Sequence, residues 1–84
     1  MELGLKERVA VITGPAKGMG AAVTRAFAEE GCRLVLAGRD TAAIEPVAQD
    51  MRERGAQVVV VPCDVTRQAD CTALADAALK LSLI

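Results

Sequence analysis

A glycine-rich segment near the N-terminus constrains this chain most: Thr13-Gly14-Pro15-Ala16-Lys17-Gly18-Met19-Gly20. It follows an apolar stretch at residues 9–13 that is typical of a strand, and it opens a segment with helical periodicity. Each glycine is expected to have its own physical role, since one turns the chain out of the strand, one lets backbone approach an anion, and one lets helix and sheet pack closely. Because a helix N-terminus presents unpaired N–H groups, the segment predicts a phosphate-binding turn.

Two further apolar stretches predict strands. Residues 34–37 end at Gly38-Arg39-Asp40, and the valine run 58–61 ends at Pro62-Cys63-Asp64-Val65. The valine run lacks polar alternation, as expected for a strand covered on both faces. Ligands of an open parallel sheet bind at the carboxyl ends of its strands. Arg39 and Asp64 are therefore expected at the same ligand-binding edge as the glycine turn.

Helical patterns alternate with the strands, over residues 18–30, 41–54 and 66–80. Gly31 and Gly55 are expected to end the first two helices, and Thr66 to cap the third. Pro46 predicts that the second helix begins late, near Glu45, or kinks. The faces expected to be buried are Met19, Ala22, Val23, Ala26 and Phe27 in the first helix, Ile44, Val47, Ala48 and Met51 in the second, and Cys71, Leu74, Ala75 and Ala78 in the third.

This alternation predicts an α/β fold: a partial Rossmann unit (βαβαβα), with a three-stranded parallel sheet in order 3-2-1 and helices on both faces. A full Rossmann sheet continues from strand 1 to a fourth strand, which this chain lacks. The strand at residues 9–12 is therefore expected to be an unprotected edge that aggregates or pairs with a second copy of the chain.

The spacing Thr13-Gly14-x-x-x-Gly18-x-Gly20 resembles that of the short-chain dehydrogenase/reductase family, in its ordinary single-domain branch, over about residues 6–80. Asp64-Val65 resembles the family's adenine-binding Asp-Val or Asp-Leu pair. The resemblance implies an NAD(P)-dependent oxidoreductase of alcohols and ketones, with residues 1–84 as the N-terminal part of its single Rossmann domain. The cofactor-binding residues that it implies are Gly14, Ala16, Lys17, Gly18, Met19, Gly20, Arg39, Asp64 and Val65.

The cofactor choice follows from charges near the adenosine ribose. The resemblance places Lys17 and Arg39 there, and Ala37 stands where many NAD-preferring relatives carry an aspartate. A 2′-phosphate needs charge-assisted donors, each worth about 1.5–3 kcal/mol. NADP is therefore expected rather than NAD. Asp40 is expected to cap the next helix rather than to contact ribose.

Structural alternatives stay open for several of these residues. Arg39 is alternatively a solvated surface side chain, and Asp64 a turn residue or helix cap. The Thr13 hydroxyl is expected to brace the turn rather than to touch a ligand. Pro15 lacks an N–H, and Ala16 stands where a serine commonly helps to hold the ribose, so both depart from the family pattern.

The family's reaction uses a tyrosine, a lysine four residues later, a serine and an asparagine. This chain has no tyrosine and no asparagine, and its one serine is Ser82. The catalytic C-terminal part is therefore expected to be absent and the 84 residues to be inactive. In the complete enzyme, hydride would pass between NADP(H) and an alcohol or ketone. The alternative is a non-catalytic nucleotide-binding or interaction fragment.

Composition excludes other classes. The net charge is −1, and one aromatic residue and no basic stripe argue against a nucleic-acid partner. A charged N-terminus and the lack of a long apolar run predict a cytoplasmic protein with no membrane contact. Three cysteines without a Cys-x-x-Cys pair, and no histidine, make a metal site improbable, and Cys32, Cys63 and Cys71 are expected to be buried. Lys17 precedes its glycine, so the turn is no P-loop.

Overall fold

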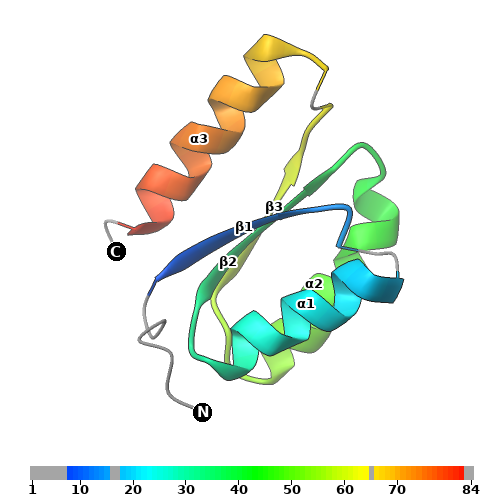
Figure 1. The fold of residues 1–84 in the computed structure, drawn as a ribbon, viewed down its shortest axis with the longest axis vertical. Helices are drawn as coiled ribbons and strands as arrows, with labels where there is room; N and C mark the ends of the chain where they lie inside the picture. Colours follow the sequence, from blue (N-terminus) through cyan, green and yellow to red (C-terminus); the bar gives the residue numbers. More distant parts are fainter. Residues whose placement is uncertain (1–7, 16–17, 65, 83–84) are drawn as a thin grey trace.

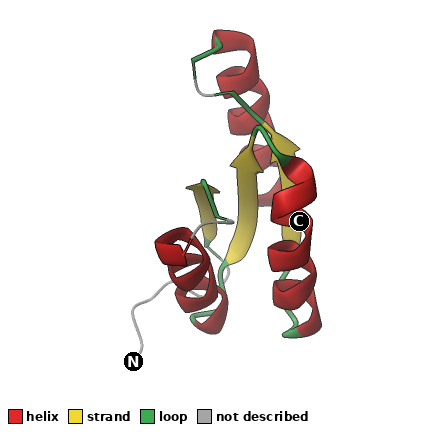
Figure 2. Ribbon diagram, turned by 90° about the vertical axis from the view of Figure 1, so that its right-hand side faces the viewer, coloured by secondary structure: helices red, strands yellow, loops and turns green. Residues whose placement is uncertain are grey.

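The computed structural model describes residues 8–15, 18–64 and 66–82, which form three strands and three helices in alternation. These are β1 (Val9–Thr13), α1 (Gly18–Glu29), β2 (Arg33–Gly38), α2 (Thr41–Glu53), β3 (Val58–Pro62) and α3 (Gln68–Ser82). The strands are parallel and lie in the order β1-β2-β3. Figure 1 shows α1 and α2 on one side of the sheet and α3 on the other, and Figure 2 gives the view turned by 90°. The predicted partial Rossmann fold is confirmed.

The main core lies between the sheet and the α1–α2 layer. The register places Ala10 opposite Leu34 and Ile12 opposite Leu36, so that alternate residues of adjacent strands share this face. The buried apolar residues that form the core are Ile12, Cys32, Leu34, Leu36, Ile44, Ala48 and Met51. The apolar face predicted for α2 is thus confirmed, as is the burial of Cys32.

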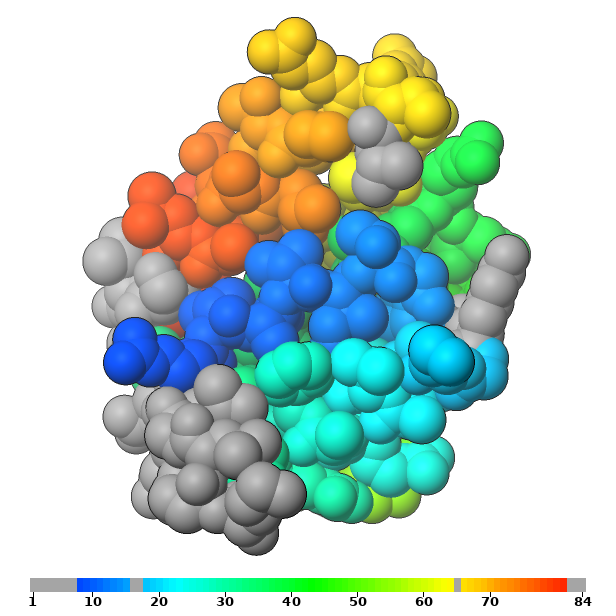
Figure 3. All heavy atoms as spheres, in the orientation of Figure 1, coloured from blue at the N-terminus to red at the C-terminus, as the bar shows by residue number. Residues whose placement is uncertain are grey.

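The opposite face of the sheet is covered by α3 alone and only in part. Val35, at the centre of this face, is fully buried, whereas its register neighbours Val11 and Val59 are 45% and 37% exposed. Figure 3 shows atoms of β1 at the surface between those of α3 and α1. The expectation that the valine run is covered on both faces is therefore only partly correct, because β3 lies at the sheet's edge. The pairing of β1 with a second copy stays a prediction.

The apolar face predicted for α1 is largely wrong. Met19 is 84% and Val23 40% exposed, and of that face only Phe27 packs against the core. The helix instead turns a different set of residues inward: Gly20, Thr24, Phe27 and Ala28. Thr24 is fully buried, and its hydroxyl donates a 2.8 Å hydrogen bond to the Gly20 carbonyl, which satisfies the hydroxyl without a partner from the sheet.

Helix α2 begins before its proline. The Asp40 carboxylate accepts a 3.2 Å hydrogen bond from the Ala43 N–H, so Asp40 is the N-cap as predicted. The helix runs from Thr41 through Pro46, and the expectation of a start near Glu45 is wrong because this cap already fixes the first turn.

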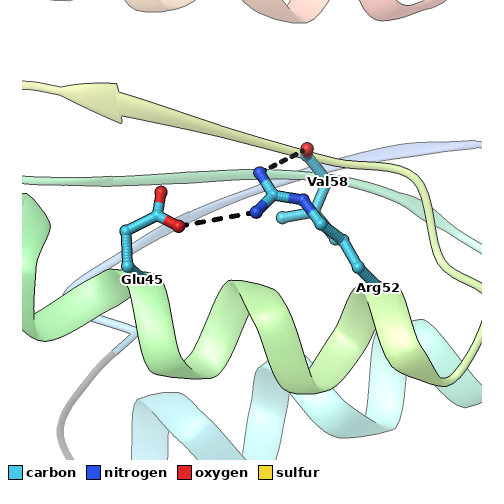
Figure 4. Close-up of polar contacts among 3 residues, drawn as sticks. All are labelled: Glu45, Arg52 and Val58. Carbon is cyan, nitrogen blue, oxygen red and sulfur yellow. Dashed lines mark hydrogen bonds and ion pairs between the residues drawn. The ribbon is translucent and has the colours of Figure 1, made fainter.

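A side-chain bridge joins α2 to β3. The Arg52 guanidinium donates a 3.1 Å hydrogen bond to the Val58 carbonyl and lies 3.5 Å from the Glu45 carboxylate, as Figure 4 shows. The ion pair is largely exposed and contributes little to stability. The hydrogen bond to the Val58 carbonyl links α2 directly to the backbone of β3.

Helix α3 begins two residues later than predicted, at Gln68. Thr66 is not its cap, because the Thr66 N–H and hydroxyl both donate to the Asp64 carboxylate in a turn that precedes the helix. The predicted burial of Cys71 and Ala75 is wrong, since both are exposed. Leu81 is the residue that α3 buries, and the Arg33 guanidinium donates a 3.1 Å hydrogen bond to its carbonyl.

The start of α1 is packed against the turn that leaves β1. Gly14 has a φ of +64°, a left-handed conformation that L side chains rarely adopt, so the chain turns sharply there. A Cβ added at Gly20 would overlap the Gly14 carbonyl oxygen and approach Pro15 Cα to 3.2 Å. Only glycine at position 20 therefore permits this approach of helix and turn.

Replacing Gly20 by alanine should lower the free energy of unfolding by about 1–3 kcal/mol. The added methyl group would clash with backbone atoms of Gly14 and Pro15, which cannot move aside as the end of a flexible side chain can. Gly18→Ala is the matched control, since a Cβ there meets nothing within 4 Å. It should change the free energy of unfolding by less than about 0.5 kcal/mol. Urea unfolding followed by far-ultraviolet circular dichroism measures both, and equal midpoints for the two variants would contradict the packing argument.

Candidate functional site

An open cleft of about 500 Å³ lies at the carboxyl ends of all three strands, and we term it the strand-end cleft. Its lining residues come from the β1–α1 turn, the end of β2, the start of α2 and the residue after β3: Thr13, Gly14, Pro15, Ala37, Gly38, Arg39, Asp40, Ala43, Ile44 and Cys63. This is the edge at which an open parallel sheet binds its ligands. The sequence-based expectation that Gly14 and Arg39 meet at one edge is thus supported by the geometry.

Backbone hydrogen bonds hold the walls of the strand-end cleft together. The Gly14 N–H donates to the Ala37 carbonyl at 3.2 Å, and the Cys63 N–H donates to the Gly38 carbonyl at 3.0 Å. Both bonds extend the strand ladder by one residue beyond β1 and β3. The central strand β2 therefore fixes the positions of the turns on either side of it.

The glycine turn presents the first turn of α1 at this edge. Gly18 is the first residue of α1, and space for a side chain there is open. Gly20 packs against Gly14 rather than facing open space. Met19 is exposed. Ala16, Lys17 and Val65, which the sequence also assigned to cofactor binding, lie outside the described residues.

Asp64 has an observed role in the turn between β3 and α3. One carboxylate oxygen accepts hydrogen bonds from the Thr66 N–H at 3.0 Å and the Thr66 hydroxyl at 2.6 Å. These two bonds, and to a lesser extent the positive charge of Arg39, hold the pKa of Asp64 below its ordinary value. The turn role, left open by the sequence, is therefore present, and the Arg39 charge reaches this carboxylate across the strand ends.

Sequence reasoning missed part of the cleft wall. Ile44 was assigned to the core, yet it also lines the strand-end cleft, and a Cβ at Gly38 would lie 2.8 Å from its terminal methyl group. Pro15 is fully buried and also lines the cleft. Cys63 is buried as predicted. The sequence signal for this contact is the spacing between Gly38 at the end of β2 and Ile44 in the first turns of α2. This spacing alone does not predict a contact unless the packing of α2 on β2 is known.

The cleft offers polar backbone, Arg39, the Asp40 carboxylate that caps α2, and an apolar wall, so it suits a ligand with an anionic group near Arg39 and a flat apolar part. Within residues 8–15, 18–64 and 66–82, no group of three or more His, Cys, Asp or Glu side chains is arranged to hold a metal ion. Across the same ranges, no helix has the length and hydropathy needed to span a bilayer.

Comparisons with known proteins agree with this geometry. The family model for short chain dehydrogenases matches residues 8–82. An uncharacterized oxidoreductase of Staphylococcus haemolyticus is 43% identical over 70 residues, which are 83% of this chain and 29% of that protein. The chain belongs to the short-chain dehydrogenase family.

Solved structures show the same fold. A short-chain dehydrogenase/reductase from Burkholderia phymatum in complex with NAD superposes with a TM-score of 0.86 at 42% identity, covering 92% of this chain and 27% of the other. A metagenomic short-chain oxidoreductase in complex with NADP gives 0.83 at 32% identity, covering 90% and 34%. The chain thus spans about a third or less of the length of these relatives.

The lowered pKa of Asp64 predicts a pH dependence of the turn. At a pH above the ordinary aspartate pKa, the ionised Asp64 carboxylate contributes its full stabilisation to the fold. As the pH falls from the ordinary pKa toward the lowered pKa of the folded state, the unfolded chain takes up the proton first, and this stabilisation is lost. Thr66→Ala should move the pKa of Asp64 back up toward its ordinary value, because it removes the hydroxyl donor.

The measurement is a carboxyl-carbon NMR titration of Asp64. Thr72→Ala is the control, because the Thr72 hydroxyl bonds to the Gln68 carbonyl within α3 and does not touch Asp64. An unchanged Asp64 titration in Thr66→Ala would show that the hydroxyl does not set the pKa.

Proposed function

We propose that this chain is the N-terminal, NADP-binding segment of a short-chain dehydrogenase/reductase-like oxidoreductase. In the complete enzyme, hydride passes between NADP(H) and an alcohol or ketone substrate. The observation that carries the proposal is the strand-end cleft, which brings the glycine turn and Arg39 to one edge of the sheet. The NAD and NADP complexes of the two solved relatives support a nicotinamide dinucleotide as the ligand.

The pyrophosphate is assigned to the glycine turn and the first turn of α1. The N–H groups at a helix N-terminus carry partial positive charge and have no partners within the helix. The open space at Gly18 lets an anion approach this backbone. Ala16, Lys17, Met19 and Gly20 belong to the same proposed contact set.

The adenosine is assigned to the side of the cleft formed by the ends of β2 and β3. Asp64 and Val65 are the proposed adenine contacts, with Ile44 supplying apolar wall. Both hydrogen bonds from Thr66 go to the same oxygen of the Asp64 carboxylate. The adenine amino group would therefore bind the other oxygen without disturbing the turn.

The preference for NADP rests on charge at the end of β2. Arg39 lines the cleft and is exposed, whereas neither Ala37 nor Gly38 carries a carboxylate for a ribose hydroxyl. The nearest carboxylate, Asp40, is engaged as the α2 cap. A guanidinium beside the ribose favours a 2′-phosphate through charge-assisted, bidentate hydrogen bonds.

Replacing Arg39 by alanine should weaken NADP binding by roughly tenfold to a hundredfold, the equivalent of one charged hydrogen bond, and should leave NAD binding nearly unchanged. Isothermal titration of both cofactors measures this difference. The matched control is Arg54→Ala, which removes an exposed arginine from the C-terminal end of α2, away from the cleft.

The control should bind both cofactors like the unmodified chain. Equal losses for NADP and NAD in Arg39→Ala would contradict the selector role of Arg39. Loss of NADP binding in the Arg54 variant would show instead that the preference comes from overall charge.

The proton transfer of the family's reaction needs a tyrosine, and this chain has none. We therefore propose that these 84 residues bind the cofactor without turning it over, the catalytic set residing in sequence beyond them. The purified chain should not oxidise NADPH with any of a panel of aldehydes and ketones, followed by absorbance at the nicotinamide band. Turnover that persists through repurification and is lost in Gly18→Leu would overturn this.

A further inference from the structure

Two thiols meet where β3 leads into α3. Cys63 directly follows β3 and is 4% exposed, whereas Cys71 lies in the first turns of α3 and is exposed. Cys71 lies close enough to Cys63 to contribute to the raised pKa of the Cys63 thiol. The buried thiol also lines the strand-end cleft, so the pair stands in the wall of the proposed nucleotide site.

The backbone holds this pair together from both sides. The Cys63 N–H is bonded to the Gly38 carbonyl at 3.0 Å, which ties the residue to the central strand. The Asp64 N–H donates a 2.9 Å hydrogen bond to the Asp70 carboxylate, which ties the start of α3 to the residue after Cys63. Cys71 directly follows Asp70, and its N–H is bonded to the Arg67 carbonyl at 3.1 Å. The loop therefore brings two cysteines together through contacts that involve neither thiol.

We propose that Cys63 and Cys71 are a redox-active pair that forms a reversible intramolecular disulfide. The hydrogen bond between Asp64 and Asp70, the residues next to the two cysteines, holds their backbones close, as formation of an S–S bond of about 2.05 Å requires. Cys32 is no competitor, because it lies buried before the start of β2, at the opposite end of the sheet. A strand of this length separates the two ends by roughly 20 Å, far beyond the reach of a disulfide.

Exposure sets the order of the chemistry. The Cys71 thiolate attacks one sulfur of a low-molecular-weight disulfide such as oxidised glutathione, forming a mixed disulfide and releasing one glutathione thiolate. Cys63 then loses its proton to solvent, and its sulfur attacks Cys71, releasing the second glutathione thiolate. The protein pair loses two electrons and two protons, and the oxidised glutathione gains them.

The environment of Cys63 suits the second position. Burial, with contributions from Cys71 and the Asp70 and Asp64 carboxylates, raises the pKa of the Cys63 thiol, so that it stays protonated and protected until its neighbour has reacted. Cys71 is the exposed residue of the pair. One buried and one exposed thiol thus divide the roles of resolving and attacking group.

The test is disulfide mapping of the full chain in glutathione redox buffers, at equilibrium and after acid quenching. Trypsin cleaves after Arg67, so a Cys63–Cys71 bond joins the peptide of residues 55–67 to that of residues 68–80. The reference is the same chain in guanidinium chloride, because a short loop closes readily even when unfolded. Because the fold holds the two cysteines near one another, the native pair should have an equilibrium constant for disulfide formation at least about tenfold above this reference.

Variants separate the pair from general thiol reactivity. Cys71→Ser, at an exposed position, should abolish the joined peptides and leave Cys63 slow to alkylate, whereas Cys32→Ser should leave the equilibrium constant of the native pair unchanged. A native equilibrium constant equal to or below that of the denatured chain would overturn the proposal. So would joined peptides that contain Cys32 in native buffer.

Discussion

The backbone contact between Gly20 and the Gly14 carbonyl is the constraint on which the site depends. It sets where α1 starts relative to the end of β1, and hence where the N-terminus of this helix lies relative to the strand ends. The Gly14 N–H is bonded in turn to the Ala37 carbonyl, so the same turn is registered to the central strand. The lack of a side chain at both glycines and one hydrogen bond therefore position the part of the strand-end cleft for which we propose phosphate binding.

The strands could be predicted from the sequence because burial at the sheet centre demands continuous apolar runs, and their order because βαβ crossovers are right-handed. Leu34, Val35, Leu36 and Ala37 are all fully buried, and no helical pattern competes with such a run. The Asp40 cap could be predicted as well, because its hydrogen bond to Ala43 N–H is local. Local signals and strong burial are thus what single-sequence reasoning captures.

The features that the sequence did not predict depend on contacts between residues that are distant in sequence, or on contacts that hydrophobic periodicity does not reveal. An apolar stripe on α1 was visible, but periodicity does not say which stripe faces the sheet, and buried Thr24 gave no hydrophobic signal. The late start of α3 follows from the Asp64 turn with Thr66. In the candidate site, the positions of Gly14 and Arg39 at the strand ends could be predicted, whereas Ile44 at the cleft wall follows only from how α2 packs over the end of β2.

The hydrogen bond from Arg52 to the Val58 carbonyl makes the β3 edge of the sheet less open to a further strand than the β1 edge. Hydrogen bonds from Leu34 to the Gln57 carbonyl and from Cys63 to the Gly38 carbonyl fix which groups of β3 face β2, so the Val58 carbonyl and the Pro62 nitrogen face outward. Arg52 occupies that carbonyl, and proline offers no donor. A further strand is thus disfavoured beside β3, whereas the sequence of β1 contains no proline. The β1 edge is therefore the less obstructed of the two edges for a further strand.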